Sequence, residues 1–192
     1  MNEASRRFVT LPNLISAVRI ILLVPLLLFF RAKMFVPTLL LFLVSAGSDA
    51  LDGIIARRWN MQSEFGRILD PLADKVTFVT LIVIFSRNVL SVVPLAVLIA
   101  AEVILLVMGA YTYMCPQWQK WISLGANIYG KIKTCFETLL VLLLIIWHFF
   151  EVLHSNLEMR NVYLFSVHSV LFLCIIFAIK SIVSHVNSRP LR

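Results

Sequence analysis

The chain has 192 residues, of which 60% are hydrophobic and 14% charged, and its formal net charge is +7. Soluble domains are only about 45–50% apolar, and the apolar residues here form long continuous runs, which excludes an ordinary soluble domain. The runs also lack the period-two alternation of a membrane β-barrel. We therefore expect one all-α polytopic membrane domain, whose basic excess reflects membrane topology and anionic lipid rather than nucleic acid.

Six predicted membrane spans follow one another along the chain, at about 13–31, 34–52, 69–87, 89–113, 133–153 and 162–184. The chain divides accordingly into a polar N-terminal segment, a membrane domain and a short polar tail, at 1–12, 13–186 and 187–192. Its three cysteines are odd in number and have no metal-type spacing, which predicts free thiols at Cys115, Cys135 and Cys174.

Lysines and arginines are unequally divided between the two sides of the predicted bundle. With the N-terminus inside, eleven of them fall on the cytoplasmic side: Arg6, Arg7, Arg57, Arg58, Arg67, Lys120, Lys131, Lys133, Lys180, Arg189 and Arg192. Four fall on the opposite side, namely Arg31, Lys33, Arg87 and Arg160. The positive-inside rule therefore places both termini, and the polar stretch between the second and third spans, in the cytoplasm.

That polar stretch, SDALDGIIARRWNMQSEFGRILDPLADK at residues 48–75, carries four aspartates. At ~100° per helical residue, one face of the first helix groups four residues: Asp49, Asp52, Gly53 and Ala56. One face of the next helix likewise groups Gly66, Asp70 and Asp74. Because the connector is short, the two helices are expected to be antiparallel neighbours, with all four carboxylates converging at the cytoplasmic border.

Four carboxylates in one place repel one another, so a positive partner is required. Within the sequence neighbourhood the candidates are Arg57, Lys75 or bound cations. The cluster contains no histidine or cysteine, and an all-oxygen ligand set suits Mg²⁺ or Mn²⁺ rather than zinc. A pair of such ions stabilises displacement at phosphorus. The small residues Gly53, Ala56 and Gly66 leave room for a phosphate-bearing ligand near the backbone.

The stretch resembles the CDP-alcohol phosphatidyltransferase family, whose motif is D-x2-D-G-x2-A-R-x8-G-x3-D-x3-D. The matching positions are Asp49, Asp52, Gly53, Ala56, Arg57, Gly66, Asp70 and Asp74. Upstream, LPNLISAVRIILLVP is similar to the first helix of the family, with Asn13, Ser16, Arg19 and Pro25 in familiar places. GKIKT at Gly130–Thr134 is similar to a segment of the phosphatidylglycerophosphate synthase branch.

The resemblance implies a six-helix enzyme, a homodimer, that uses two Mg²⁺ or Mn²⁺ ions and CDP-diacylglycerol. Asp49, Asp52, Asp70 and Asp74 would hold the metals, and Asp74 would also be the general base on the acceptor hydroxyl. Arg57 would contact the CDP phosphates, beside Gly53, Ala56, Ser63, Gly66, Asn13 and Ser16. Acceptor contacts are expected from Lys131, Lys133 and Arg19. The active site would face the cytoplasm, in a bacterial inner membrane or an organellar equivalent.

The acceptor half departs from the branch pattern at two positions. Ala101 stands before Glu102 where an arginine is usual, and Glu137 stands where glutamine is usual. Glu137 lies four residues after Lys133 and can pair with it, and Glu102, in mid-span, needs a buried partner. Glycerol 3-phosphate is the expected acceptor.

Other readings stay open at this stage. The same chemistry with phosphatidylglycerol, giving cardiolipin, or with a less charged alcohol is an alternative. An ion transporter is a more distant one, because carboxylates within a membrane also mark ion paths. For Arg19 the alternative to a functional contact is a side chain that snorkels to the interface. For Lys131 and Lys133 it is an ordinary positive-inside loop.

Overall fold

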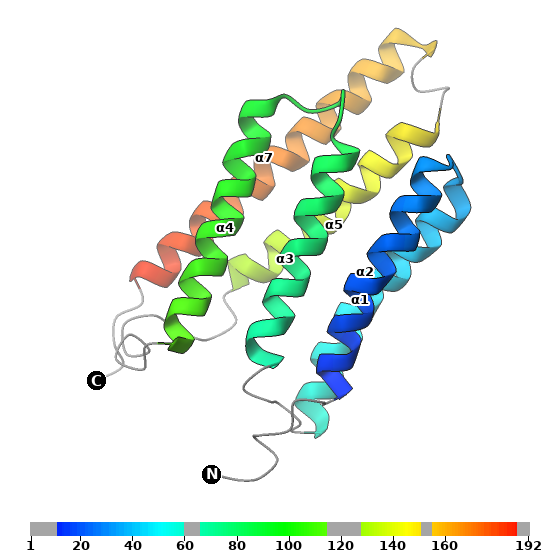
Figure 1. Cartoon of the computed structure of the whole chain (residues 1–192). Helices are drawn as coiled ribbons and strands as arrows, with labels where there is room; N and C mark the ends of the chain where they lie inside the picture. The colour runs from blue at the N-terminus through cyan, green and yellow to red at the C-terminus, as the bar shows by residue number, and fades with distance from the viewer. Residues whose placement is uncertain (1–10, 60–65, 115–127, 151–154, 188–192) are drawn as a thin grey trace. The chain divides into compact units, whose positions relative to one another are not determined.

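The computed structural model describes residues 11–59, 66–114, 128–150 and 155–187, and these ranges are helical with short turns (Figure 1). Side chains are described within them except at 11–17, 49–59, 66–71, 112–114 and 187. The described helices are α1 (Leu11–Arg31), α2 (Phe35–Trp59), α3 (Gly66–Phe85), α4 (Val92–Met114), α5 (Ile128–Phe149) and α7 (Leu157–Asn187). All six predicted spans coincide with these helices to within a few residues, except that α2 continues well past 52.

Three of these helices are long and apolar enough to cross a bilayer on their own composition: Val92–Tyr111, Ile128–Phe149 and Leu157–Val186. Large apolar side chains on them face outward, as at Val92 and Phe165, which are 79% and 75% exposed. Such exposure would be unfavourable in water and suits a lipid environment. The prediction of an all-α polytopic membrane protein is confirmed.

The described helices fall into two compact units, residues 1–80 and 81–192. In the first unit α1 packs along α2. The chain turns between them because the amide of Met34 donates to the carbonyl of Phe29 and the amide of Lys33 donates to that of Phe30, each at 3.0 Å. Lys33 adopts a φ of 54°, the left-handed conformation that usually belongs to glycine at this point of a helix end.

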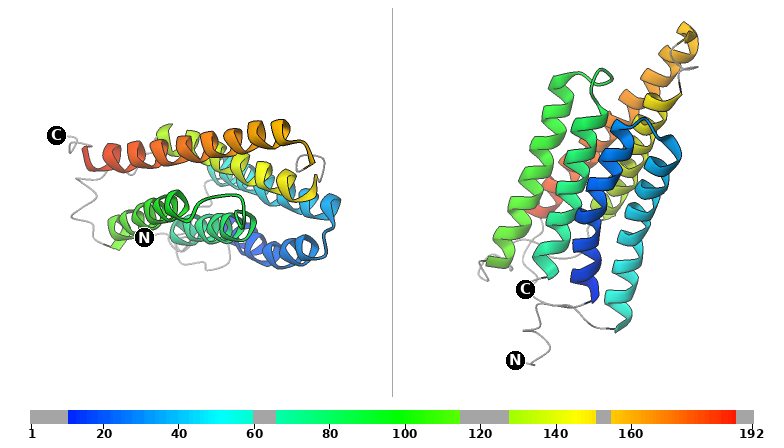
Figure 2. Two further views of the ribbon diagram at one scale, coloured as in Figure 1. Left: turned by 90° about the horizontal axis from the view of Figure 1, so that it is seen from above. Right: turned by 45° about the vertical axis from the view of Figure 1, so that its right-hand side comes forward.

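In the second unit α7 packs against both α4 and α5 (Figure 2). Fully buried leucines fill the spaces between them: Leu98, Leu140, Leu144 and Leu171. The hydroxyl of Tyr163 donates to the carbonyl of Leu143 at 2.6 Å, and its ring stacks on Trp147 with centroids 5.7 Å apart.

The end of α3 is also tied into this second unit. His148 of α5 donates from Nε2 to the carbonyl of Phe85 at 2.7 Å. Phe85 is the last residue of α3, and carbonyls at a helix end lack partners within their own helix. The imidazole therefore caps α3.

Candidate active site

The four predicted metal ligands are distributed over two helices. Asp49 and Asp52 lie in the C-terminal part of α2, together with Gly53, Ala56 and Arg57. Asp70 and Asp74 lie in the first half of α3, which begins at Gly66. The helical backbone assumed for the spacing argument is therefore present, while the convergence of all four carboxylates stays a prediction.

The structure describes only some of the remaining residues that are predicted to bind the CDP-lipid. Asn13 and Ser16 lie in the first turns of α1. Ser63 lies outside the described residues. Asp74 and Arg19 are the two members of the predicted site in the first unit whose side chains are described, and they are in contact.

Arg19 of α1 and Asp74 of α3 form an ion pair between Nη1 and Oδ1. The Arg19 side chain is 4% exposed, whereas that of Asp74 is 38% exposed. Arg19 therefore does not snorkel out of its helix, because its charged end is buried against a carboxylate. Asp74, in contrast, keeps part of its surface open to a ligand.

Sequence reasoning did not find this pairing, because it sought the positive partner of the aspartates among nearby residues such as Arg57 and Lys75. A signal was available in the charge of Arg19 itself. An ionisable side chain inside a membrane span almost always has a partner, and the aspartates were the available acids at the same end of the bundle.

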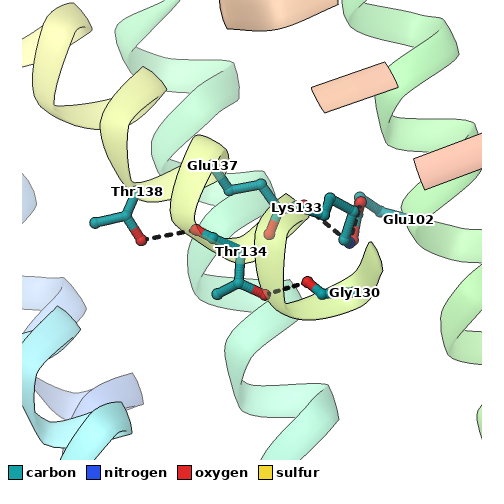
Figure 3. Close-up of polar contacts among 6 residues, drawn as sticks. All are labelled: Glu102, Gly130, Lys133, Thr134, Glu137 and Thr138. Atoms are coloured by element: carbon teal, nitrogen blue, oxygen red, sulfur yellow. Dashed lines mark hydrogen bonds and ion pairs between the residues drawn. The ribbon is translucent and has the colours of Figure 1, made fainter. Parts of the chain in front are cut away.

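A second buried charge cluster joins α4 to α5 in the other unit (Figure 3). Lys133 Nζ lies 2.6 Å from Glu102 Oε1 and 2.9 Å from Glu137 Oε1. The three side chains are 3%, 1% and 6% exposed, respectively. We call these three residues the α4–α5 charge triad. Both carboxylates of the triad contact the same ammonium group.

Both sequence expectations about this cluster are confirmed. Glu137 pairs with Lys133 because residues four apart meet on one helix face. The partner that Glu102 required in mid-span is the same lysine. Lys133 is thus held on both sides, whereas Lys131, the other lysine predicted to contact the acceptor, is exposed.

The first turns of α5 present further polar groups beside the triad (Figure 3). Thr134 donates to the carbonyl of Gly130 at 3.1 Å, and Thr138 donates to that of Thr134 at 3.0 Å. Ser181 of α7 is buried close to Gly130, since a Cβ on that glycine would lie 3.8 Å from its Oγ. A methyl group at this position would make only an ordinary van der Waals contact with Ser181.

Comparison with known proteins decides the family. The sequence matches the CDP-alcohol phosphatidyltransferase family over residues 9–183. The chain belongs to this family. A CDP-diacylglycerol–glycerol-3-phosphate 3-phosphatidyltransferase of Aquifex aeolicus is 35% identical to it over 134 residues, which cover 68% of this chain and 72% of the relative. The Escherichia coli K12 protein of the same name is 34% identical over 134 residues, covering 65% of this chain and 70% of the relative.

As a CDP-alcohol phosphatidyltransferase, the chain is an enzyme of phospholipid synthesis. Among the side chains described, no three His, Cys, Asp or Glu residues gather as a metal site. Three of the four motif aspartates are outside that set. The donor chemistry fits a hard cation, because the motif supplies only carboxylates. The partly open carboxylate of Asp74 fits it too.

Proposed function

We propose that the enzyme transfers a phosphatidyl group from CDP-diacylglycerol to glycerol 3-phosphate and releases CMP. The observation that carries this proposal is the family match over residues 9–183, which includes the whole aspartate motif. The names of the Aquifex and Escherichia coli relatives support glycerol 3-phosphate as the acceptor.

In the proposed reaction the acceptor hydroxyl oxygen attacks the phosphorus that is bonded to diacylglycerol. A new P–O bond forms, the P–O bond to CMP breaks, and CMP leaves with the bonding electrons. Asp74 takes the hydroxyl proton, for which its 38% side-chain exposure leaves access. Asp49, Asp52, Asp70 and Asp74 would hold two Mg²⁺ or Mn²⁺ ions, and bound ions of this kind neutralise charge that develops on the leaving phosphate.

The CDP end of the substrate is assigned to the helices that carry the motif. Arg57 would contact the phosphates of CDP, and Gly53, Ala56 and Gly66 would let the nucleotide approach the backbone. Asn13, Ser16 and Ser63 complete the proposed nucleotide site. The positive-inside distribution of charge supports a cytoplasmic active site in an integral membrane protein. A homodimer is proposed from the family resemblance alone.

The acceptor end is proposed to involve Lys131, which is exposed, and Lys133, whose 3% exposed side chain an acceptor phosphate would reach only if the triad opened. The α4–α5 charge triad bears on which acceptor is used, because two of its three members are carboxylates, and carboxylates repel a nearby anion. This observation favours, as a second candidate, the same chemistry with a less anionic alcohol. A lipid alcohol such as phosphatidylglycerol, which would give cardiolipin, belongs in the same test.

The experiment is CMP release by the purified full-length protein in detergent with CDP-diacylglycerol and Mg²⁺ or Mn²⁺. Glycerol 3-phosphate, phosphatidylglycerol, inositol phosphate, inositol and serine are offered separately. We expect release with glycerol 3-phosphate, loss of release in EDTA, and loss of turnover in Asp74→Asn with CDP-lipid binding retained.

Four results would contradict part or all of the proposal. Metal-independent turnover would remove the metal site, and turnover in Asp74→Asn near the wild-type rate would remove the base. Release with another acceptor alone would keep the chemistry and change the substrate. Ion flux in liposomes without any CMP would instead identify a transporter.

A further inference from the structure

The contact between Arg19 and Asp74 gives the first helix a role that neither the motif nor the relatives' names assign. Asp74 is the residue to which the proposed function gives the proton transfer. Arg19 reaches its Oδ1 from α1, a different helix from any that carries the aspartate motif. The pair therefore fixes the position of the proposed base from outside the motif.

We propose that Arg19 is a positioning residue for Asp74 and does not contact the acceptor. This inference rests on the proposed function for the part that Asp74 plays in the reaction. It replaces the expectation, drawn from the family resemblance, that Arg19 helps to bind the acceptor.

Burial of the guanidinium is the first argument for this role. The Arg19 side chain is 4% exposed, so an acceptor that arrives from water finds almost none of its surface. The Asp74 side chain offers far more, at 38%. Of the two partners, the carboxylate is placed to meet a ligand and the guanidinium is placed to hold the carboxylate.

The shape of the two groups is the second argument. A guanidinium is planar and always charged, so it fixes the orientation of a carboxylate more tightly than an ammonium does. The ion pair joins Arg19 Nη1 to Asp74 Oδ1. Orientation of this kind matters because a misplacement of about 1 Å at a reacting group can lower a rate on the order of 10²-fold.

Charge balance is the third argument. The motif places four like-charged groups on two helices, and such groups resist being brought together. A permanently positive side chain that is built into α1 offsets one of them whether or not cations are bound. Removal of that charge should therefore be felt in the metal-free protein as well as in turnover.

The kinetic test compares Arg19→Gln and Arg19→Lys with wild type in the CMP-release assay. We expect Arg19→Gln to lower kcat on the order of 10²-fold, with the KM for CDP-diacylglycerol and for the acceptor nearly unchanged. Arg19→Lys should recover part of this loss, because it restores the charge without the planar fork. Arg31→Gln, an exposed arginine at the end of the same helix, is the matched control and should leave kcat unchanged.

A second readout needs no turnover. Thermal unfolding is measured in EDTA for wild type, Arg19→Gln, Asp74→Asn and the double variant. If the two side chains act as a pair, the loss from Arg19→Gln should shrink in the Asp74→Asn background, which is the signature of direct coupling. Arg31→Gln should lower stability by the same small amount in both backgrounds.

The outcomes distinguish failure of the proposed role of Arg19 from failure of the proposed transferase activity. A raised acceptor KM with unchanged kcat in Arg19→Gln overturns the inference and restores the acceptor contact. Unchanged kinetics, or fully additive melting temperatures, also overturn it. A wild-type chain that releases no CMP with any acceptor overturns the proposed function instead, and the catalytic meaning of Arg19 with it. Should Arg19→Gln fail to fold, the drop in kcat of Arg19→Lys decides the same question.

Discussion

At the scale of single residues, the α4–α5 charge triad is the feature with the largest expected cost of burying charge. Three ionisable side chains are almost completely buried, with Lys133 between Glu102 and Glu137. Burial of each charge costs desolvation free energy, which the contacts with oppositely charged partners offset. Lys133 has two such partners in the triad, whereas each glutamate has one. The stability of the second unit is therefore expected to respond very differently to the loss of each member.

Lys133→Met should be strongly destabilising, by about 3–5 kcal/mol, because it leaves two buried carboxylates without their cation. Glu137→Gln is the matched control, since it leaves a neutral pair of Lys133 and Glu102 in place. Thermal unfolding in detergent should rank Lys133→Met far below wild type and Glu137→Gln at or above it. Equal melting temperatures for the two variants would show that the triad is not a buried unit.

Glu137→Gln should also change the use of an anionic acceptor. If Lys133 contacts the acceptor phosphate as proposed, removal of the competing carboxylate should lower the KM for glycerol 3-phosphate about tenfold, or ~1.4 kcal/mol. The KM for CDP-diacylglycerol serves as the internal control and should not move. An unchanged or raised acceptor KM would argue that Lys133 serves the structure alone.

The two charge clusters show what single-residue patterns can and cannot predict. The pairing of Glu137 with Lys133 follows from a spacing of four on one helix, which is local information. The pairing of Arg19 with Asp74 depends on how α1 meets α3, and no spacing rule encodes that. The sequence alone marked both Lys133 and Arg19 as candidate functional residues. It predicted the partner of Lys133 but not the partner of Arg19.

At the scale of elements, the structure differs from the sequence-based prediction mainly at the ends of helices. The apolar run that predicted the second span stops near 52, yet α2 continues to Trp59. Hydropathy reports burial in lipid, while the helix continues on backbone hydrogen bonding through the polar motif. Likewise α1 ends without glycine, because Lys33 takes up the left-handed conformation of the turn.

Substitution at Lys33 tests that turn. Lys33→Gly should stabilise the protein relative to Lys33→Ala by about 1 kcal/mol, because alanine retains the steric penalty of a left-handed residue and glycine does not. Both variants remove the same charge, so their difference isolates the backbone. Thermal unfolding in detergent measures it, and an alanine variant as stable as the glycine variant would contradict the expectation.

At the scale of the whole molecule, composition was sufficient for the membrane class, and the six described helices correspond to six apolar runs, of which three are long and apolar enough to span a bilayer. The side of the membrane on which the active site lies, the division at 1–12, 13–186 and 187–192, and the homodimer stay predictions. Charge asymmetry is the only information that bears on orientation, and it acts during insertion rather than through contacts within the fold.

Orientation can be measured with two near-isosteric substitutions in a chain whose three native cysteines are replaced by alanine. Ser91→Cys lies at an exposed position between α3 and α4, on the side predicted to face away from the cytoplasm. Ser188→Cys lies in the predicted cytoplasmic tail. A membrane-impermeant maleimide applied to intact cells should label Ser91→Cys alone. Labelling of Ser188→Cys alone would show the reverse orientation, and labelling of both positions would contradict the predicted topology.

The contact of Tyr163 with the carbonyl of Leu143, backed by its stacking on Trp147, has a consequence for how the protein meets bilayers of different thickness. Membrane helices accommodate mismatch by tilting or by sliding relative to their neighbours. A slide of α7 along α5 by one turn would break this hydrogen bond and separate the Tyr163 ring from Trp147. We therefore expect α5 and α7 to adapt to a thinner or thicker membrane by tilting together.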